Sequence, residues 1–298
     1  MTEQNTRLGI LLMIATTFVF SIQDGLSRHL AGAYNVYMIV MLRYWFFASF
    51  VMVLTARRPG GLKRAMATKQ PLVQIFRGLL LAAEIVVMVQ AFTHLGLVES
   101  HSIFSSYPLM VAAFSGPILG EAVGWRRWTA IGIGFVGVLI VLEPGVTVFS
   151  PWAAAPLLAA CMFALYGLLT RYVARQDPAS VSFFWTGVPG AVAMTGVGLY
   201  FWQPMTGTDW VLMACLCCTA VLGHGLLIRA FEVAEASAIQ PFAFLQLIFA
   251  SGVGVMVFGD AIHLNTVIGT IVVVSAGLFT LWRAKVKSGV TVVPSTPP

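Results

Sequence analysis

The sequence predicts an all-α membrane protein of ten transmembrane helices, built as two inverted five-helix repeats with both termini in the cytoplasm. Three observations support this fold class. Of 298 residues, 59% are hydrophobic and only 9% are charged, whereas a soluble domain carries about 25% charged residues. The apolar residues form ten long runs, and the basic residues are concentrated in every second one of the segments that connect these runs. The composition therefore suits a surface that faces lipid.

Each apolar run is long enough to cross a bilayer, because a helix of roughly 20 residues spans about 30 Å of hydrocarbon. The first run also resembles a signal peptide, since Arg7 precedes it and Ala31-Gly32-Ala33 follows it. We keep this run as a span, because the distribution of positive charge requires ten crossings. We expect the ten spans at 8–28, 36–55, 72–93, 97–118, 125–142, 152–171, 180–201, 210–229, 236–258 and 265–282.

The basic residues orient these spans. With the N-terminus inside and ten crossings, 14 of the 17 Lys and Arg residues lie in cytoplasmic segments, and only Arg28 lies outside. Such an excess is typical of membrane proteins, which keep positive charge on the cytoplasmic side. Losing one span would destroy the alternation. The cytoplasmic residues are Arg7, Arg57, Arg58, Lys63, Arg64, Lys69, Arg126, Arg127, Arg171, Arg175, Arg229, Arg283, Lys285 and Lys287.

Short matches between the two halves indicate an internal repeat. Because each half holds five spans, an odd number, the second half enters the membrane from the opposite side, as in carriers that work by alternating access. We expect repeats at 1–147 and 148–286 and a disordered cytoplasmic tail at 287–298. The matches are Ala91-Phe92 with Ala230-Phe231 and Gly120-Glu121 with Gly259-Asp260, both 139 residues apart, and Ser27-Arg28 with Thr170-Arg171, 143 apart.

One stretch of the first half resembles a known family. Gly120-Glu121 after the fourth span, the run through Trp125-Arg126-Arg127-Trp128, and Glu143-Pro144-Gly145 after the fifth are similar to the EamA-type branch of the drug/metabolite transporter superfamily. The likeness extends over about 8–285, although Gly259-Asp260 replaces the usual Gly-Glu in the second half. Arg43 and Arg77-Gly78 look most like the subgroup of bacterial riboflavin importers and S-adenosylmethionine uptake carriers.

This resemblance implies a multi-pass protein of the bacterial inner membrane that moves a small organic metabolite. Riboflavin uptake is the first candidate, and S-adenosylmethionine uptake or export of amino acids or drugs are alternatives. The expected partners are that substrate and the lipid bilayer, with no nucleic acid, no cofactor and no bound metal; a homodimer stays open. An intramembrane enzyme would need a catalytic cluster that the sequence does not show, and a channel has little use for an inverted repeat.

Charged side chains inside the spans are candidates for the site, because each costs several kcal/mol in hydrocarbon unless it is paired or hydrated. Asp24 lies about 24 Å from the inner face and Arg43 about 10 Å from the outer one, so the two can pair, either as a fixed bridge or in the site. Glu84 lies near the midplane and is expected to bind substrate or carry a proton. Arg77 lies near the inner face, where its stem can snorkel. His101 lies near the outer end of its span.

Uncharged polar residues at related positions extend the candidate cavity. Some are linked by the repeat offsets, and others share a helical face or offer aromatic surface to a flat ligand. Pro108, within the fourth predicted span, is expected to free a carbonyl there. The alternative interpretation is that these residues have a structural role and only form hydrogen bonds between helices. The candidates are Gln23, Ser105, Tyr166, Trp185, Gln240 and Gln246.

A nucleotide-binding pattern in the sequence is a false positive. Gly132-Ile-Gly134-Phe-Val-Gly137 matches the dinucleotide fingerprint as a string, but it lies inside an apolar span with no strand before it. We expect its glycines to allow close helix packing. Cys161, Cys215, Cys217 and Cys218 lie in apolar segments without a CxxC spacing, which indicates packing residues.

Overall fold

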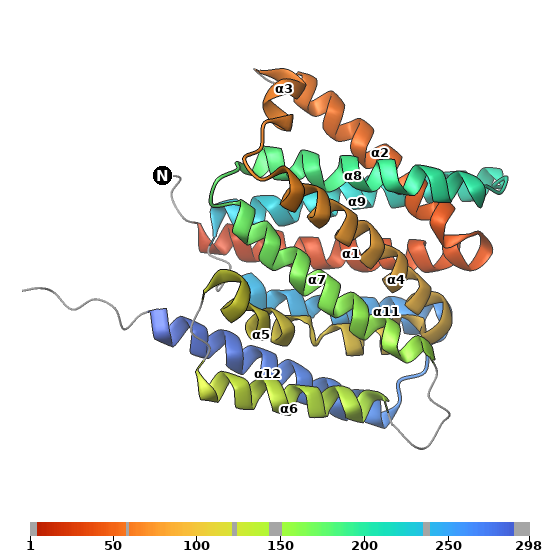
Figure 1. The fold of residues 1–298 in the computed structure, drawn as a ribbon. Coiled ribbons are helices and arrows are strands. Elements are labelled where there is room, and N and C mark those ends of the chain that lie inside the picture. The colour runs from red at the N-terminus through yellow and green to blue at the C-terminus, as the bar shows by residue number, and fades with distance from the viewer. Residues whose placement is uncertain (1–4, 58–59, 121–123, 143–150, 235–238, 289–298) are drawn as a thin grey trace, which may run out of the picture.

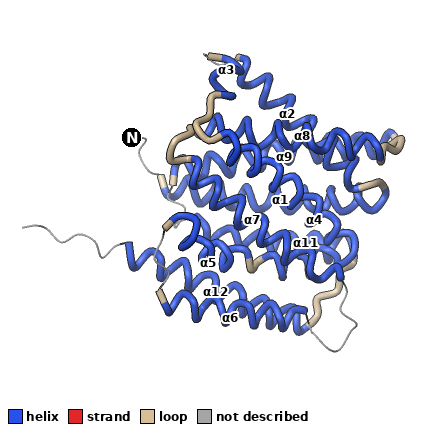
Figure 2. Tube along the Cα trace, viewed as in Figure 1, coloured by secondary structure: helices blue, strands red, loops and turns tan. Residues whose placement is uncertain are grey.

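A computed structural model describes residues 5–57, 60–120, 124–142, 151–234 and 239–288. Within these ranges every regular element is a helix, as Figure 2 shows. The Gly120-Glu121 and Glu143–Gly145 motifs and the predicted tail lie wholly or partly outside the described residues. The elements are α1 (Thr6–Ala33), α2 (Val36–Ala56), α3 (Gly61–Met66), α4 (Pro71–Phe104), α5 (Tyr107–Leu119), α6 (Trp125–Leu142), η1 (Pro151–Ala153), α7 (Ala154–Val173), α8 (Ala179–Tyr200), α9 (Gly207–Val233), η2 (Gln240–Phe244), α11 (Leu245–Phe258) and α12 (Leu264–Ser288).

Apolar helices long enough to cross a membrane dominate the chain. In the described part, eight helices have that length and hydropathy, and two shorter apolar helices cover Tyr107–Leu119 and Trp128–Leu142. The all-helical membrane fold is thus confirmed, while the count of ten spans stays a prediction. Figure 1 shows the helices as one bundle, with α6 and α12 side by side at its lower edge.

The third and fourth predicted spans differ most from expectation. α4 runs on for 34 residues with a kink at Gly96, where φ is 83° and ψ is 175°, and it ends at Phe104. A new helix, α5, then begins at Tyr107. The expectation of a proline in mid-span is therefore wrong: Pro108 stands in the first turn of α5, where its missing N–H costs nothing.

The ninth predicted span is broken in a similar place. It consists of the 3-10 turn η2 followed by α11, and Leu245 begins the regular helix. Ser105, at the end of α4, and Phe244, at the end of η2, are separated by the repeat offset of 139. Gly120 and Gly259, another pair at that offset, both cap their helices with a left-handed backbone, at φ of 75° and 70°. The two breaks thus occupy equivalent places in the predicted halves.

Helix pairing follows the same pattern. α1 packs on α9 and α11, and α7 packs on α4 and α5, while α2 pairs with α8 and α6 with α12. In the predicted repeat, α1 corresponds to α7, and α9 and α11 correspond to α4 and α5. Exchanging the halves therefore converts the contacts of α1 into those of α7, while the pairs α2–α8 and α6–α12 are unchanged. These are the contacts that an inverted repeat predicts, and the repeat itself stays a prediction.

The contact between α6 and α12 explains the misleading nucleotide motif. A Cβ on Gly137 would lie 2.8 Å from the carbonyl oxygen of Gly269, and a Cβ on Gly269 would lie 2.5 Å from that of Gly137. Gly134 packs equally closely against Leu109. Gly137 and Gly269 let α6 and α12 touch along their backbones, and Gly134 makes room for the Leu109 side chain, so two glycines of the motif allow the close packing that the sequence predicted; Gly132 has open space instead.

Candidate functional site

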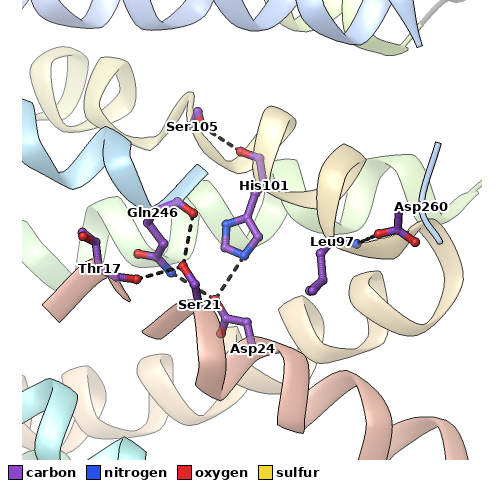
Figure 3. A network of polar contacts seen from close by, with 8 residues as sticks. All are labelled: Thr17, Ser21, Asp24, Leu97, His101, Ser105, Gln246 and Asp260. Atoms are coloured by element: carbon purple, nitrogen blue, oxygen red, sulfur yellow. Dashed lines mark hydrogen bonds and ion pairs between the residues drawn. The ribbon is translucent and has the colours of Figure 1, made fainter. Parts of the chain in front are cut away.

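A buried polar cluster joins three helices near the break in α4. Nε2 of His101, on α4, lies 3.1 Å from Oδ2 of Asp24, on α1. The same oxygen accepts a hydrogen bond of 3.1 Å from the amide of Gln246, on α11. Figure 3 shows the three side chains converging from their helices. The structure therefore brings together residues that the sequence placed in both halves.

The surrounding groups hold this cluster in place. Ser105 donates to the carbonyl of His101 at 2.7 Å, and the ring of Phe92 stacks on the His101 imidazole with centroids 5.3 Å apart. On α1, Ser21 donates to the carbonyls of Thr17 and Gln246, at 2.8 Å and 3.3 Å. Because both the imidazole and α11 are anchored, the orientation of the Asp24 carboxylate is defined by its neighbours.

Arg43 and Glu84 are buried close to this cluster without direct partners. Their exposed fractions are 7% and 5%, and neither forms a hydrogen bond or an ion pair within 4.0 Å with another described residue. The expected bridge from Arg43 to Asp24 is thus not formed; Asp24 is engaged by His101 and Gln246. The three charges still interact through space, since Arg43 lies in the field of both Asp24 and Glu84.

A small cavity lies beside Arg43. It has room for about one water molecule and is bounded by α2, α4, α8 and α9. His224 contributes to the wall, and its ring contacts Phe47 at 5.7 Å between centroids. The lining residues are Arg43, Tyr44, Phe47, Leu81, Ile85, Thr186 and His224.

Arg77 is buried in a separate network nearer the other end of the bundle. Its side chain is not extended to a surface, as snorkelling would require, since only 1% of the residue is exposed. Nε and Nη2 donate to Oε1 of Gln74, Nη2 also donates to the carbonyl of Ser182 at 2.5 Å, and Nη1 donates to Tyr166 and Thr170. Five hydrogen bonds therefore satisfy the guanidinium from within the protein, and Tyr166 belongs to this network.

Asp177, between α7 and α8, completes that network and was not singled out from the sequence. It accepts hydrogen bonds from the Thr68 hydroxyl, from the Lys69 N–H at 3.1 Å and from Gln74 at 2.9 Å. Burial works to raise the pKa of this carboxyl, but the hydrogen bonds outweigh it and lower the pKa below the usual range. Its position in a polar loop looked ordinary, so no sequence signal distinguished it.

Asp260 forms a third network at the kink of α4. Both of its carboxylate oxygens lie 2.8 Å from Nη1 of Arg28, and Oδ2 accepts the N–H of Leu97 at 2.8 Å. Arg28 also lies 4.2 Å from the ring centroid of Phe258. The repeat matches at Ser27-Arg28 and Gly259-Asp260 were the sequence signals for this link, which ties α1 and α11 to the turn at Gly96.

The remaining predicted site residues form no hydrogen bond or ion pair with the three networks among the described residues, or their side chains lie outside that part of the chain. Gln23 is buried beside Asp24, and its Oε1 has no hydrogen-bond partner among the described residues. Trp185 is half-buried on α8 with its Nε1 also unpartnered. Gln240 begins η2, and its side chain lies outside the described residues. In the described part of the chain, no three His, Cys, Asp or Glu residues gather as they would around a metal ion.

Known proteins resemble this chain over most of its length. Residues 7–143 match the EamA-like transporter family. An S-adenosylmethionine uptake transporter of Rickettsia prowazekii is 24% identical over 277 residues, which cover 93% of each chain. A riboflavin transporter of Vibrio cholerae is 25% identical, with 93% of this chain and 94% of the relative covered. The pseudopaline exporter CntI of Pseudomonas aeruginosa is 23% identical, with 90% and 94% covered.

A solved crystal structure of a protein adds evidence on the fold alone. It superposes with a TM-score of 0.64 at 15% sequence identity, covering 93% of this chain and 98% of the other. The relatives' names describe transporters, and the described residues form the apolar helices that a multi-pass membrane protein needs. Taken with the match over 7–143, these findings confirm the resemblance drawn from the sequence: this chain is similar to EamA-like transporters in its first half and to named small-molecule transporters over most of its length.

Proposed function

We propose that this protein is a secondary transporter that moves a small organic metabolite across the bacterial inner membrane by alternating access between two inverted halves. The observation that carries the proposal is the pair of breaks at Ser105 and Phe244, related by the repeat offset and adjacent to the cluster of Asp24, His101 and Gln246. Carriers with inverted repeats place substrate at discontinuous helices between the halves.

The physical reason is the state of the backbone at such a break. A broken helix leaves N–H and C=O groups without partners in their own segment, and hydrocarbon cannot satisfy them. They are tolerated where protein or a polar cavity surrounds them. Polar side chains from α1, α4 and α11 supply those surroundings here, so the breaks and the cluster support one functional site.

The relatives offer two substrates for test. Riboflavin was the first candidate from the sequence, and S-adenosylmethionine is named for an equally similar relative. Other relatives include an exporter. Sequence identities near 24% do not separate these possibilities, so the substrate must come from chemistry and from transport measurements.

Purified protein in liposomes tests the proposed activity. A carrier shows saturable counterflow, in which labelled substrate enters against unlabelled substrate trapped inside. Ion conductance without saturable exchange would instead indicate a channel, and chemical conversion of a lipid would indicate an enzyme. Either result, without counterflow, would contradict the proposal.

Accessibility labelling tests the proposed orientation. In a variant without its four cysteines, Gln203→Cys should react with a membrane-impermeant maleimide from outside the cell, because it lies between the seventh and eighth predicted spans. Lys63→Cys should react only after the membrane is opened. The reverse pattern would overturn the cytoplasmic placement of the termini.

A further inference from the structure

Two buried ionisable side chains, one basic and one acidic, have no hydrogen-bond or ion-pair partner among the described residues. The guanidinium of Arg43, on α2, and the carboxylate of Glu84, on α4, form no hydrogen bond or ion pair with another described residue. They are close enough to interact electrostatically. Buried charges normally have partners, because an uncompensated one is expensive. A group that joins the pair would remove this cost.

The other buried charges near by are already engaged, which makes these two distinctive. Asp24 has His101 and Gln246, and Arg77 has five hydrogen bonds. The neighbours in sequence of Arg43 and Asp24 also include buried polar atoms that have no hydrogen-bond partner among the described residues: the hydroxyl of Tyr44 and Oε1 of Gln23. Such polar atoms are available to form hydrogen bonds with a polar ligand.

We propose that Arg43 and Glu84 are the two poles of a binding site for a substrate that carries both a carboxylate and an ammonium group, as the head of an α-amino acid does. This inference rests on the proposed transport function and specifies its substrate class. The planar guanidinium fork suits a carboxylate, and the Glu84 carboxylate suits an ammonium group. The small cavity beside Arg43 has room for about one water-sized group next to the guanidinium, and Glu84 does not line it.

The two transported compounds named among the relatives differ in this feature. S-Adenosylmethionine has an α-amino acid head and a further positive charge on sulfur, whereas riboflavin has neither a carboxylate nor an ammonium group. The charges therefore favour S-adenosylmethionine over the first candidate from the sequence.

The first experiment needs no variant. Full-length protein in liposomes is assayed for counterflow of labelled S-adenosylmethionine, the standard amino acids and riboflavin, with decarboxylated S-adenosylmethionine as a competitor. We expect counterflow only of compounds with an amino acid head, and about 10- to 100-fold weaker competition by the decarboxylated analogue, the loss expected for a charge-assisted hydrogen bond. Counterflow of riboflavin alone would overturn this inference and leave the transporter standing. Counterflow of none would overturn both.

The second experiment assigns the poles. Arg43→Gln should weaken binding of S-adenosylmethionine about 10- to 100-fold, yet leave that of the decarboxylated analogue nearly unchanged, because the lost partner is the carboxylate. Glu84→Gln should weaken both ligands, since both retain the ammonium group. Arg64→Gln on the exposed α3 and Glu99→Gln farther along α4 are the controls and should bind as wild type does. Equal weakening of both ligands by Arg43→Gln would overturn the assignment.

Discussion

Arg43 and Arg77 lie in neighbouring spans and are buried to a similar degree, with 7% and 1% exposed, yet their surroundings are opposite. Arg77 donates five hydrogen bonds to its own protein, whereas Arg43 donates none to the described residues. Burial of a charge in a membrane helix therefore does not by itself mark a binding site. The state of its hydrogen bonds separates an arginine that holds helices together from one left available to a ligand.

The largest effect should come from exchanging Arg77 for Met. The change leaves Gln74, the Ser182 carbonyl and the hydroxyls of Tyr166 and Thr170 without their donor, and we expect a loss of about 2–4 kcal/mol in stability. The measurement is the melting temperature in detergent. Arg43→Met should cost less, because Arg43 donates no hydrogen bond to the described residues and only its through-space interaction with Asp24 and Glu84 is lost. Equal destabilisation by the two variants would contradict the comparison.

The sequence indicated depth along the membrane better than rotation about a helix axis. Rise per residue placed Asp24 and His101 in the same outer half, where the structure brings them together. It could not show that Asp24 faces His101 and not Arg43, because the rotation of α1 depends on packing against α4, α9 and α11. Likewise, depth suggested that Arg77 could reach the inner interface, but its hydrogen bonds come from helices whose positions only the fold defines.

The breaks in the helices were harder still to predict. Apolar runs through 97–118 and 236–258 are continuous in composition, so hydropathy cannot reveal that α4 ends at Phe104 or that η2 precedes α11. The repeat offset, in contrast, survived as matched glycine caps at Gly120 and Gly259. The sequence therefore indicated where glycine ends a helix, but it did not indicate the points at which packing interrupts a helix.

The next largest effect should come from Gly96→Ala, which tests the end of the molecule opposite the Arg77 network. The backbone at Gly96 has φ of 83°, and an added Cβ would lie 2.8 Å from both carboxylate oxygens of Asp260. Strain in this region costs about 1–3 kcal/mol, so the melting temperature should fall. Gly132→Ala is the control, since its Cβ would meet no atom within 4 Å. An unchanged melting temperature for Gly96→Ala would show that the kink adapts.

A smaller loss is expected for Asp260→Asn. The amide keeps an acceptor for the Leu97 N–H but loses the charge that faces Arg28, so about 1–2 kcal/mol should be lost. Adding Arg28→Gln should cost little more, because the two side chains act as a pair. Additive losses in melting temperature for the single and double variants would mean that the ion pair contributes little.

The smallest effect should be the pH dependence at Asp177, which sharpens the contrast between a satisfied network and an open site. Its pKa is lowered in the folded protein, so the stability that it contributes is present above the unfolded pKa of about 3.9 and is lost as pH falls through the folded value. Asp177→Asn should therefore melt below wild type at pH 7, and the gap should narrow as the pH is taken below about 4. Melting curves of both proteins in an acid-tolerant detergent provide the measurement. A gap that stays constant across this range would mean that Asp177 acts through the shape of its hydrogen bonds and not through its charge.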